Sequence, residues 1–87
     1  MRIEIKHHIA LKIEKKHNVR VSEVLEVFEG RIYIKRVGKN RYMIIGKTAS
    51  GRYLTLFVDK IGRKLELVTA RDATDSEKRL YKMRTES

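Results

Sequence analysis

Several residue types are missing from this chain of 87 residues, and the absence of Cys excludes whole classes of protein and site. There is no Cys, which excludes a disulfide framework, a thiolate nucleophile and a zinc knuckle. Pro and Trp are absent as well. No continuous apolar stretch has the length of a signal peptide or a membrane span. We therefore expect a cytoplasmic protein without a membrane contact.

The length predicts a single domain over residues 1–87, because a chain of this size has room for one modest core. Hydrophobic residues make up 41% of it and charged residues 37%. This composition is too apolar for a disordered chain. A folded domain with a heavily charged surface is the expectation.

Positive charge is concentrated in the middle of the chain, whose formal net charge is +10. Residues 30–64 hold ten Lys and Arg against the single acid Asp59, a balance of +9. Residues 1–29 hold six against five, and residues 65–87 hold five against five. A charge that served only solubility would be spread evenly. The concentration favours an anionic partner, either a nucleic acid or an acidic protein, over a merely solvated face.

The first third of the sequence predicts a short strand followed by two helices. Residues 1–5 alternate between polar and apolar side chains, as in a strand. Apolar positions recur at helical spacing from His7 to His17, after which "HNVRV" interrupts the pattern. Ser22 is expected to cap a second helix, and Gly30 is expected to end it.

After Gly30 the period of the apolar pattern changes to two. Four alternating segments, "RIYIKRV", "RYMIIGK", "RYLTLFVDK" and "KLELVTA", are separated by three short connections that contain Gly. They predict an antiparallel meander. Residues 74–77 form a capping box that starts a final helix reaching about Arg84. The result is an α+β fold, β-α-α-β-β-β-β-α, with a twisted antiparallel sheet of four to five strands and all helices on one face.

The alternation within "RYLTLFVDK" assigns side chains to the two faces of the sheet. Leu54, Leu56 and Val58 form the more apolar row, which is expected to face the helices. The opposite face then mixes aromatic and polar groups and suits a nucleic acid or another partner. Its residues in this strand are Tyr53, Thr55 and Phe57.

Three segments resemble the BrnT toxin family. "KKHNVRVSEVLEVFEG" is similar to the helix pair of that family, and "RYMIIGKTASGRYLTLFVDK" is similar to its central hairpin. "LELVTARDATDSEKRLYKMR" resembles the closing "I.AR.AT..ER..Y" segment and is the most specific part. Together the resemblance covers about residues 9 to 83, whereas the opening "MRIEIKHHIALKIE" departs from the usual start of the family.

The resemblance implies a RelE/ParE-like fold and the toxin of a type II toxin–antitoxin pair. It further implies a metal-independent mRNA endoribonuclease, ribosome-dependent or free, without a cofactor. The implied partners are RNA and a cognate antitoxin of the ribbon-helix-helix type. RelE-like ribonucleases lack a standard acid–base pair, so a missing histidine constellation is compatible with this activity.

The candidate site residues are cations at strand ends. Arg41, Lys47, Arg52 and Arg71 match the family's "RY", "GR" and "AR" positions, Lys47 less regularly. Guanidinium groups offer paired donors to phosphate oxygens and offset the charge that develops at a cleaved phosphate. We expect Lys47, Arg52 and Arg71 to act in catalysis. RNA contacts are expected from Arg41, Lys35, Lys39 and Lys60.

Two residues of the closing segment have alternative interpretations. Tyr81 is a further catalytic candidate that either stacks on a base or donates to a phosphate, or it packs against the sheet beside Leu80. Arg71 either binds phosphate or forms a salt bridge that fixes the final helix, with Asp72, Asp75 or Glu77 as its partner.

His17 is the remaining catalytic candidate. It recurs in the family's "KHGV" pattern, yet it also follows the apolar stripe of its helix, where a half-buried structural histidine is common. His7 and His8 are adjacent and point in different directions. None of these spacings is typical of a metal site, so no metal is expected.

Two other functions remain open. A protein that kept the fold without the activity would bind RNA or an acidic protein, with a salt-sensitive affinity and no cleavage. A homodimer formed through the open sheet face or an edge strand is the third alternative, and it would make the charge incidental.

Overall fold

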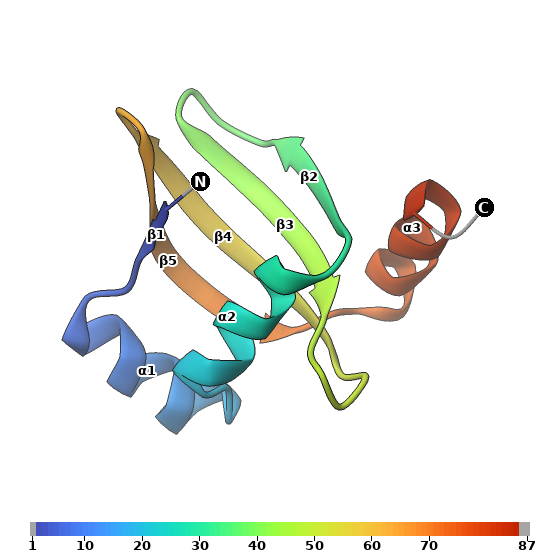
Figure 1. Cartoon of the computed structure of the whole chain (residues 1–87), viewed down its shortest axis with the longest axis horizontal. Coiled ribbons are helices and arrows are strands. Elements are labelled where there is room, and N and C mark those ends of the chain that lie inside the picture. The colour runs from blue at the N-terminus through green and yellow to red at the C-terminus, as the bar shows by residue number, and fades with distance from the viewer. Residues whose placement is uncertain (1, 86–87) are drawn as a thin grey trace.

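The computed structural model describes residues 2–85, with the elements in the predicted order (Figure 1). Residue 1, part of the predicted first strand, lies outside the described residues. No helix in the described part of the chain is long and apolar enough to cross a membrane. The elements are β1 (Arg2–Glu4), α1 (His7–His17), α2 (Val21–Glu29), β2 (Ile32–Arg36), β3 (Arg41–Lys47), β4 (Tyr53–Ile61), β5 (Lys64–Asp72) and α3 (Asp75–Thr85).

The sheet has the strand order β1-β5-β4-β3-β2, and its four later strands form the predicted antiparallel meander. The first strand differs from the prediction, because β1 pairs with β5 in parallel and makes the sheet mixed. The two helices carry the chain from β1 at one edge of the sheet to β2 at the other. An ion pair of 3.1 Å between Glu4 and Lys64 joins the parallel pair.

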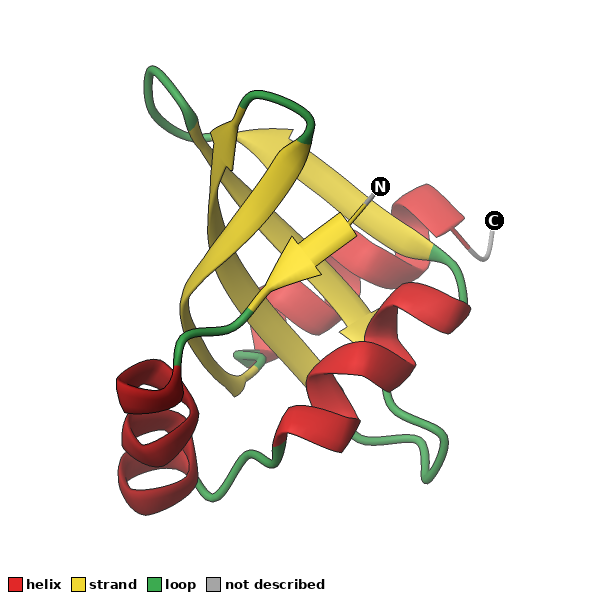
Figure 2. Cartoon of the chain, turned by 60° about the vertical axis from the view of Figure 1, so that its left-hand side comes forward, coloured by secondary structure: helices red, strands yellow, loops and turns green. Residues whose placement is uncertain are grey.

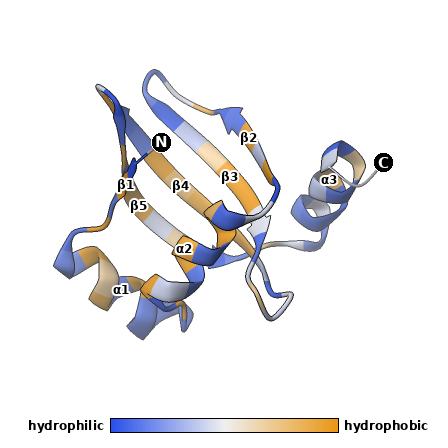
Figure 3. Ribbon diagram, viewed as in Figure 1, coloured by the Kyte–Doolittle hydropathy of each residue, from blue (hydrophilic) through white to orange (hydrophobic). Residues whose placement is uncertain are grey.

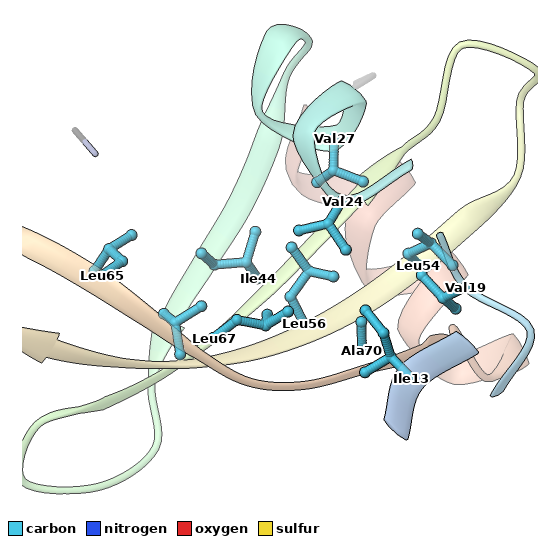
Figure 4. Close-up of a cluster of buried hydrophobic side chains, with 11 residues drawn as sticks. Ile13, Val19, Val24, Val27, Ile44, Leu54, Leu56, Leu65, Leu67 and Ala70 are labelled. Carbon is cyan, nitrogen blue, oxygen red and sulfur yellow. The ribbon is translucent and has the colours of Figure 1, made fainter. Parts of the chain in front are cut away.

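The main core lies between the sheet and the first two helices. Ile13 of α1 and Val24 and Val27 of α2 are fully buried against the sheet (Figure 4). The predicted row Leu54, Leu56 and Val58 is fully buried on this face, which confirms the assignment. The hydrophobic effect of this one cluster accounts for the docking of both helices.

The third helix packs on the opposite face, so the prediction of all helices on one face is wrong. Figure 2 shows α3 behind the sheet, with α1 and α2 in front of it. A second cluster on that side contains Ile45, Ala73 and Tyr81. Tyr81 is the one buried residue among those of α3, and the helix is otherwise mainly hydrophilic (Figure 3). A helix without a wide apolar stripe gives no sequence signal for the face on which it docks.

The helix ends follow the prediction with one correction. The helix α1 spans the predicted residues, and Asn18, which follows its last residue, adopts a left-handed conformation with φ 53°. The helix α2 begins at Val21, so Ser22 lies inside it. The Glu23 carboxylate accepts a hydrogen bond of 3.0 Å from the backbone N–H of Arg20, the residue that precedes the helix. The carboxylate of the third helical residue thus stabilises the start that Ser22 was expected to cap.

Candidate nucleic-acid interface

The side of the sheet that carries α3, here called the α3 face, combines aromatic rings with cationic side chains. The second core cluster joins it to the helix, with Tyr33, Met43, Tyr53 and Leu80 partly buried at its margin. Thr55 is fully buried and Phe57 is half-buried, so α3 covers part of the face that the alternation predicted to be open. The candidate Arg71 and Lys47 also lie at this face.

A β-bulge explains why Arg71 reaches the α3 face. Phe57 pairs with Thr69 and Val58 pairs with Leu67, which leaves Val68 as an extra residue in β5. Strict alternation would have placed Arg71 on the same side as Leu67, inside the core. The bulge reverses the order beyond this point. Ala70 enters the core instead, and Arg71 pairs with Thr55 across the strands.

Arg71 forms a bidentate ion pair with Glu77 of α3. Its two terminal nitrogens donate to Glu77 Oε1 and Oε2 at 2.8 and 2.9 Å. Glu77 also accepts from the Thr55 hydroxyl at 2.8 Å and from the Thr74 backbone N–H at 2.9 Å. The hydrogen bonds from Arg71, followed by those from Thr74 and Thr55, lower the pKa of Glu77 to about 2. The predicted capping box is confirmed, since Glu77 N–H donates in turn to Thr74 Oγ1 at 3.2 Å.

Three lysines surround the ring of Tyr53. The ammonium nitrogens of Lys82, Lys47 and Lys78 lie 5.4, 5.7 and 6.0 Å from the ring centroid. Lys78 and Lys82 lie one turn apart on α3, and Lys47 ends β3. Cations at this distance are attracted by the ring quadrupole, and three of them around one ring make a positive potential that attracts anions. Lys78 and Lys82 were not among the predicted site residues, because their separation from Tyr53 in the sequence conceals the contact. Tyr53 itself was assigned to the face that suits a partner.

Tyr81 has a structural role in this arrangement. It is 3% exposed, and its hydroxyl donates to the carbonyl of Arg31 at 3.0 Å. Its ring meets Tyr53 edge-on, with centroids 5.7 Å apart. These contacts match the packing interpretation of Tyr81. Through its ring contact Tyr81 supports Tyr53, around which the three lysines lie.

Arg52 and His17 lie apart from this group. Arg52 Nε donates to Asp72 at 2.7 Å, and its terminal nitrogens donate to Glu23 at 3.1 Å and to the carbonyls of Asn18 and His17 at 2.8 and 3.2 Å. The pKa of Asp72 is lowered chiefly by its hydrogen bond from Arg52. Arg52 therefore connects both N-terminal helices to β5.

The four residues expected to contact RNA gather at the other end of the sheet. Arg41 starts β3, whereas Lys47 ends it. At about 3.3 Å per strand residue the two are separated by roughly 20 Å. Arg41 donates to both carboxylate oxygens of Asp59 at 2.8 and 3.0 Å. Lys35, Lys39 and Lys60 are exposed near the hairpin turns. The cations expected to form one cradle beside Arg71 are thus divided between two surfaces.

Among the described residues of the α3 face, few side chains are candidates for general acid–base chemistry. A carboxylate whose pKa is about 2, such as Glu77, is a poor proton acceptor near neutral pH. Among residues 2–85, no three His, Asp or Glu side chains gather in a way that would hold a metal ion. What the face does offer is fixed positive charge next to an aromatic ring, which suits the binding of phosphate and of an unpaired base.

Comparison with known proteins identifies the fold. No protein-family model matches the sequence, and no curated protein matches it. The crystal structure of the ribonuclease toxin BrnT from Brucella abortus is similar, with a TM-score of 0.70. This chain has the fold of BrnT. The match covers 86% of this chain and 99% of that one at 15% sequence identity, so it is a distant likeness of architecture.

Proposed function

We propose that this protein is a toxin of the ribonuclease type that binds and cleaves RNA at its α3 face. The observation that carries the proposal is the convergence of Lys47, Lys78 and Lys82 on the half-buried ring of Tyr53. It lies in a chain that shares its fold with a ribonuclease toxin. The closing sequence segment, which resembles the BrnT family, supplies both Arg71 and the helix with two of the lysines.

Single-stranded RNA fits this surface because it offers phosphates and unpaired bases together. The lysines would contact successive phosphates, and the aromatic groups would support a base. Phe57 extends the surface along β4, and the guanidinium of Arg71 lies 5.6 Å from the centroid of its ring. RNA would therefore run from the lysine cluster toward Arg71.

Arg71 keeps donors available for such a substrate. A guanidinium has five N–H groups, and the described bonds to Glu77 and to the Asp72 carbonyl use three of them. Its side chain is 32% exposed. Glu77 holds the group in place, so that the remaining donors and the positive charge are directed at a bound phosphate.

Cleavage in this proposal relies on the hydroxyl of the RNA itself. The ribose 2′-oxygen attacks the adjacent phosphorus, the bond to the 5′-oxygen breaks, and a 2′,3′-cyclic phosphate results. The 2′-hydroxyl releases its proton to water, and the departing 5′-oxygen gains one from water. Arg71 and the lysines stabilise the additional negative charge on the phosphate during this step. No metal or cofactor takes part.

As a toxin, the protein would need an antitoxin partner in the same cell. The family resemblance implies one with a ribbon-helix-helix DNA-binding domain, membership of the RelE/ParE group and action in the cytoplasm. A small gene next to this one that encodes such an antitoxin would support the proposal.

The test combines cell growth with RNA cleavage. Expression without an antitoxin should arrest growth, and the purified protein should produce fragments with 2′,3′-cyclic phosphate ends. Lys78→Gln/Lys82→Gln should weaken both effects. Lys15→Gln/Lys16→Gln, a pair of exposed lysines on α1, should not. Normal growth and intact RNA at good soluble expression would exclude the ribonuclease.

A specific observation favours a second function, an RNA-binding module without catalysis. Arg41, Arg52 and Arg71 each form an ion pair with an acid, and such pairs reduce the positive charge available to a substrate. This module would retain salt-sensitive RNA binding and the lysine dependence, but it would leave RNA intact. The predicted homodimer is tested separately by light scattering at low and high salt.

A further inference from the structure

The sheet has a second charged surface, the hairpin end, which consists of residues 35–41 and 59–64 around the turns β2–β3 and β4–β5. The two turns lie side by side at one end of the sheet (Figure 1). The backbone N–H of Lys60 donates to the carbonyl of Asn40 at 2.7 Å. The bidentate pair of Arg41 with Asp59 ties the same two hairpins together. The hairpin end is therefore one connected surface.

This surface holds most of the charge excess of the molecule. Seven of the ten Lys and Arg in residues 30–64 lie in its two segments, whose own single acid is Asp59, while Lys64 is also paired with Glu4 of β1. Asp59 is engaged by Arg41, whose hydrogen bonds lower the pKa of that carboxyl. Arg36 donates to the carbonyls of Gly38 and Lys39 at 3.1 and 2.7 Å. It thereby stabilises the β2–β3 turn and contributes its positive charge to this surface.

Two aliphatic side chains are exposed among these cations. Val37 is 47% exposed and Ile61 is 48% exposed. Both line one shallow hollow, together with Arg41 and Asp59. Ile61 also borders a neighbouring hollow beside Arg63. The surface thus combines apolar contact area with a strongly positive rim.

We propose that the hairpin end docks an acidic protein segment that carries aliphatic side chains. Carboxylates would complement the cations, and Leu, Ile or Val of the segment would cover Val37 and Ile61. A protein fits better than RNA because neither of the two segments contains an aromatic residue on which a base would stack. The exposed side chains of Val37 and Ile61 would also bury no apolar surface against the charged phosphates of RNA.

This inference is independent of the ribonuclease proposal. The hairpin end and the lysine cluster lie at opposite ends of β3. It gives Lys35, Lys39 and Lys60 a protein partner in place of the expected RNA. A partner seated here would leave the α3 face accessible.

The test uses two short helical peptides with identical numbers of Glu, one with Leu and one with Ser at the positions between them. Fluorescence anisotropy with the full chain should show that the Leu peptide binds about tenfold more tightly than the Ser peptide. Amide shifts in NMR spectra should map binding to residues 35–41 and 59–64. Equal affinities, or shifts elsewhere on the molecule, would overturn the proposal.

Variants separate the apolar part from the charge. Val37→Ser/Ile61→Ser should reduce binding of the Leu peptide to the level of the Ser peptide, while the melting temperature stays unchanged. Lys39→Glu/Lys60→Glu should abolish binding of both peptides. The matched pair Lys78→Gln/Lys82→Gln on the α3 face should bind as the parent does. If Lys39→Glu/Lys60→Glu instead removes RNA binding while the peptides still bind, the hairpin end belongs to RNA.

Discussion

Arg71 and Glu77 form a bidentate ion pair of 2.8 and 2.9 Å that links the last strand to the last helix. The pair depends on the extra residue Val68 in β5, which directs Arg71 away from the core. Glu77 also receives hydrogen bonds from Thr55 and Thr74, so one carboxylate joins the sheet, the cap and the arginine. Together with the burial of Tyr81, this contact fixes the position of α3 and that of Lys78 and Lys82.

Glu77→Gln should therefore destabilise the protein in a pH-dependent manner. The pKa of Glu77 is about 2 in the folded chain, against an ordinary 4.5. A carboxyl whose pKa is lower in the folded than in the unfolded chain stabilises the fold at pH values above its unfolded pKa. This stabilisation disappears as the pH falls through the folded pKa. We expect a loss of about 3 kcal/mol at pH 7 and less than half of that at about pH 3. Urea unfolding at both pH values measures it.

Asp75→Asn is the matched control for this prediction. Asp75 occupies the same first turn of α3 and is exposed, so its substitution should change stability only slightly. An equal loss for Glu77→Gln at both pH values would show that the ion pair does not set the pH dependence.

Gly46→Ala should destabilise the contact between β3 and α2. A Cβ at this position would lie 2.7 Å from Val27 Cγ1 and 3.4 Å from Ile32 Cγ2. Since Val27 is fully buried, the helix must shift to make room, and we expect a loss of about 1–3 kcal/mol. Gly30→Ala is the control, because nothing lies within 4 Å of its added Cβ. Thermal unfolding should separate the two variants clearly.

Arg52→Ala distinguishes a structural from a catalytic role for this arginine. Its guanidinium bonds Asp72 and Glu23 and also the carbonyls of His17 and Asn18. Removing it takes one donor from each of these acceptors, so we expect a loss of about 2–3 kcal/mol. RNA affinity of the folded variant should be unchanged.

The comparison for Arg52→Ala is Arg63→Ala, an exposed arginine in the β4–β5 turn, which should leave stability unaltered. An Arg52→Ala variant of parental stability that no longer cleaves RNA would assign the residue to catalysis. Chemical denaturation and a cleavage assay on the same preparations give both readouts.

The sequence predicted those parts of the fold that depend on local pattern. Alternating segments separated by short turns with Gly gave the meander, and the spacing of apolar residues gave the bounds of α1. The capping box at Thr74 located the start of α3 because its two hydrogen bonds are made within four residues. Each of these signals acts over a few residues.

The remaining features depend on contacts between distant residues. The bulge at Val68 reverses the alternation without any Gly or Pro to mark it. Helix α3 docks through Tyr81 and its hydrogen bond to Arg31, fifty residues away in the sequence. The acids that engage Arg41 and Arg52, Asp59 and Asp72, lie 18 and 20 residues further along the chain. A charge count along the chain therefore predicted one cationic cradle, whereas the fold divides the cations between the α3 face and the hairpin end.

The salt dependence of RNA binding tests the central claim, that the lysines around Tyr53 hold phosphate. The affinity for a short single-stranded RNA is measured over a range of salt concentrations, for the parent, Lys78→Gln/Lys82→Gln and Lys15→Gln/Lys16→Gln. Each lost phosphate contact lowers the slope of log K against log salt by about 0.7. The α3 pair should thus reduce the slope by about 1.4 and weaken binding, while the α1 pair matches the parent. Identical slopes and affinities for all three proteins would contradict the claim.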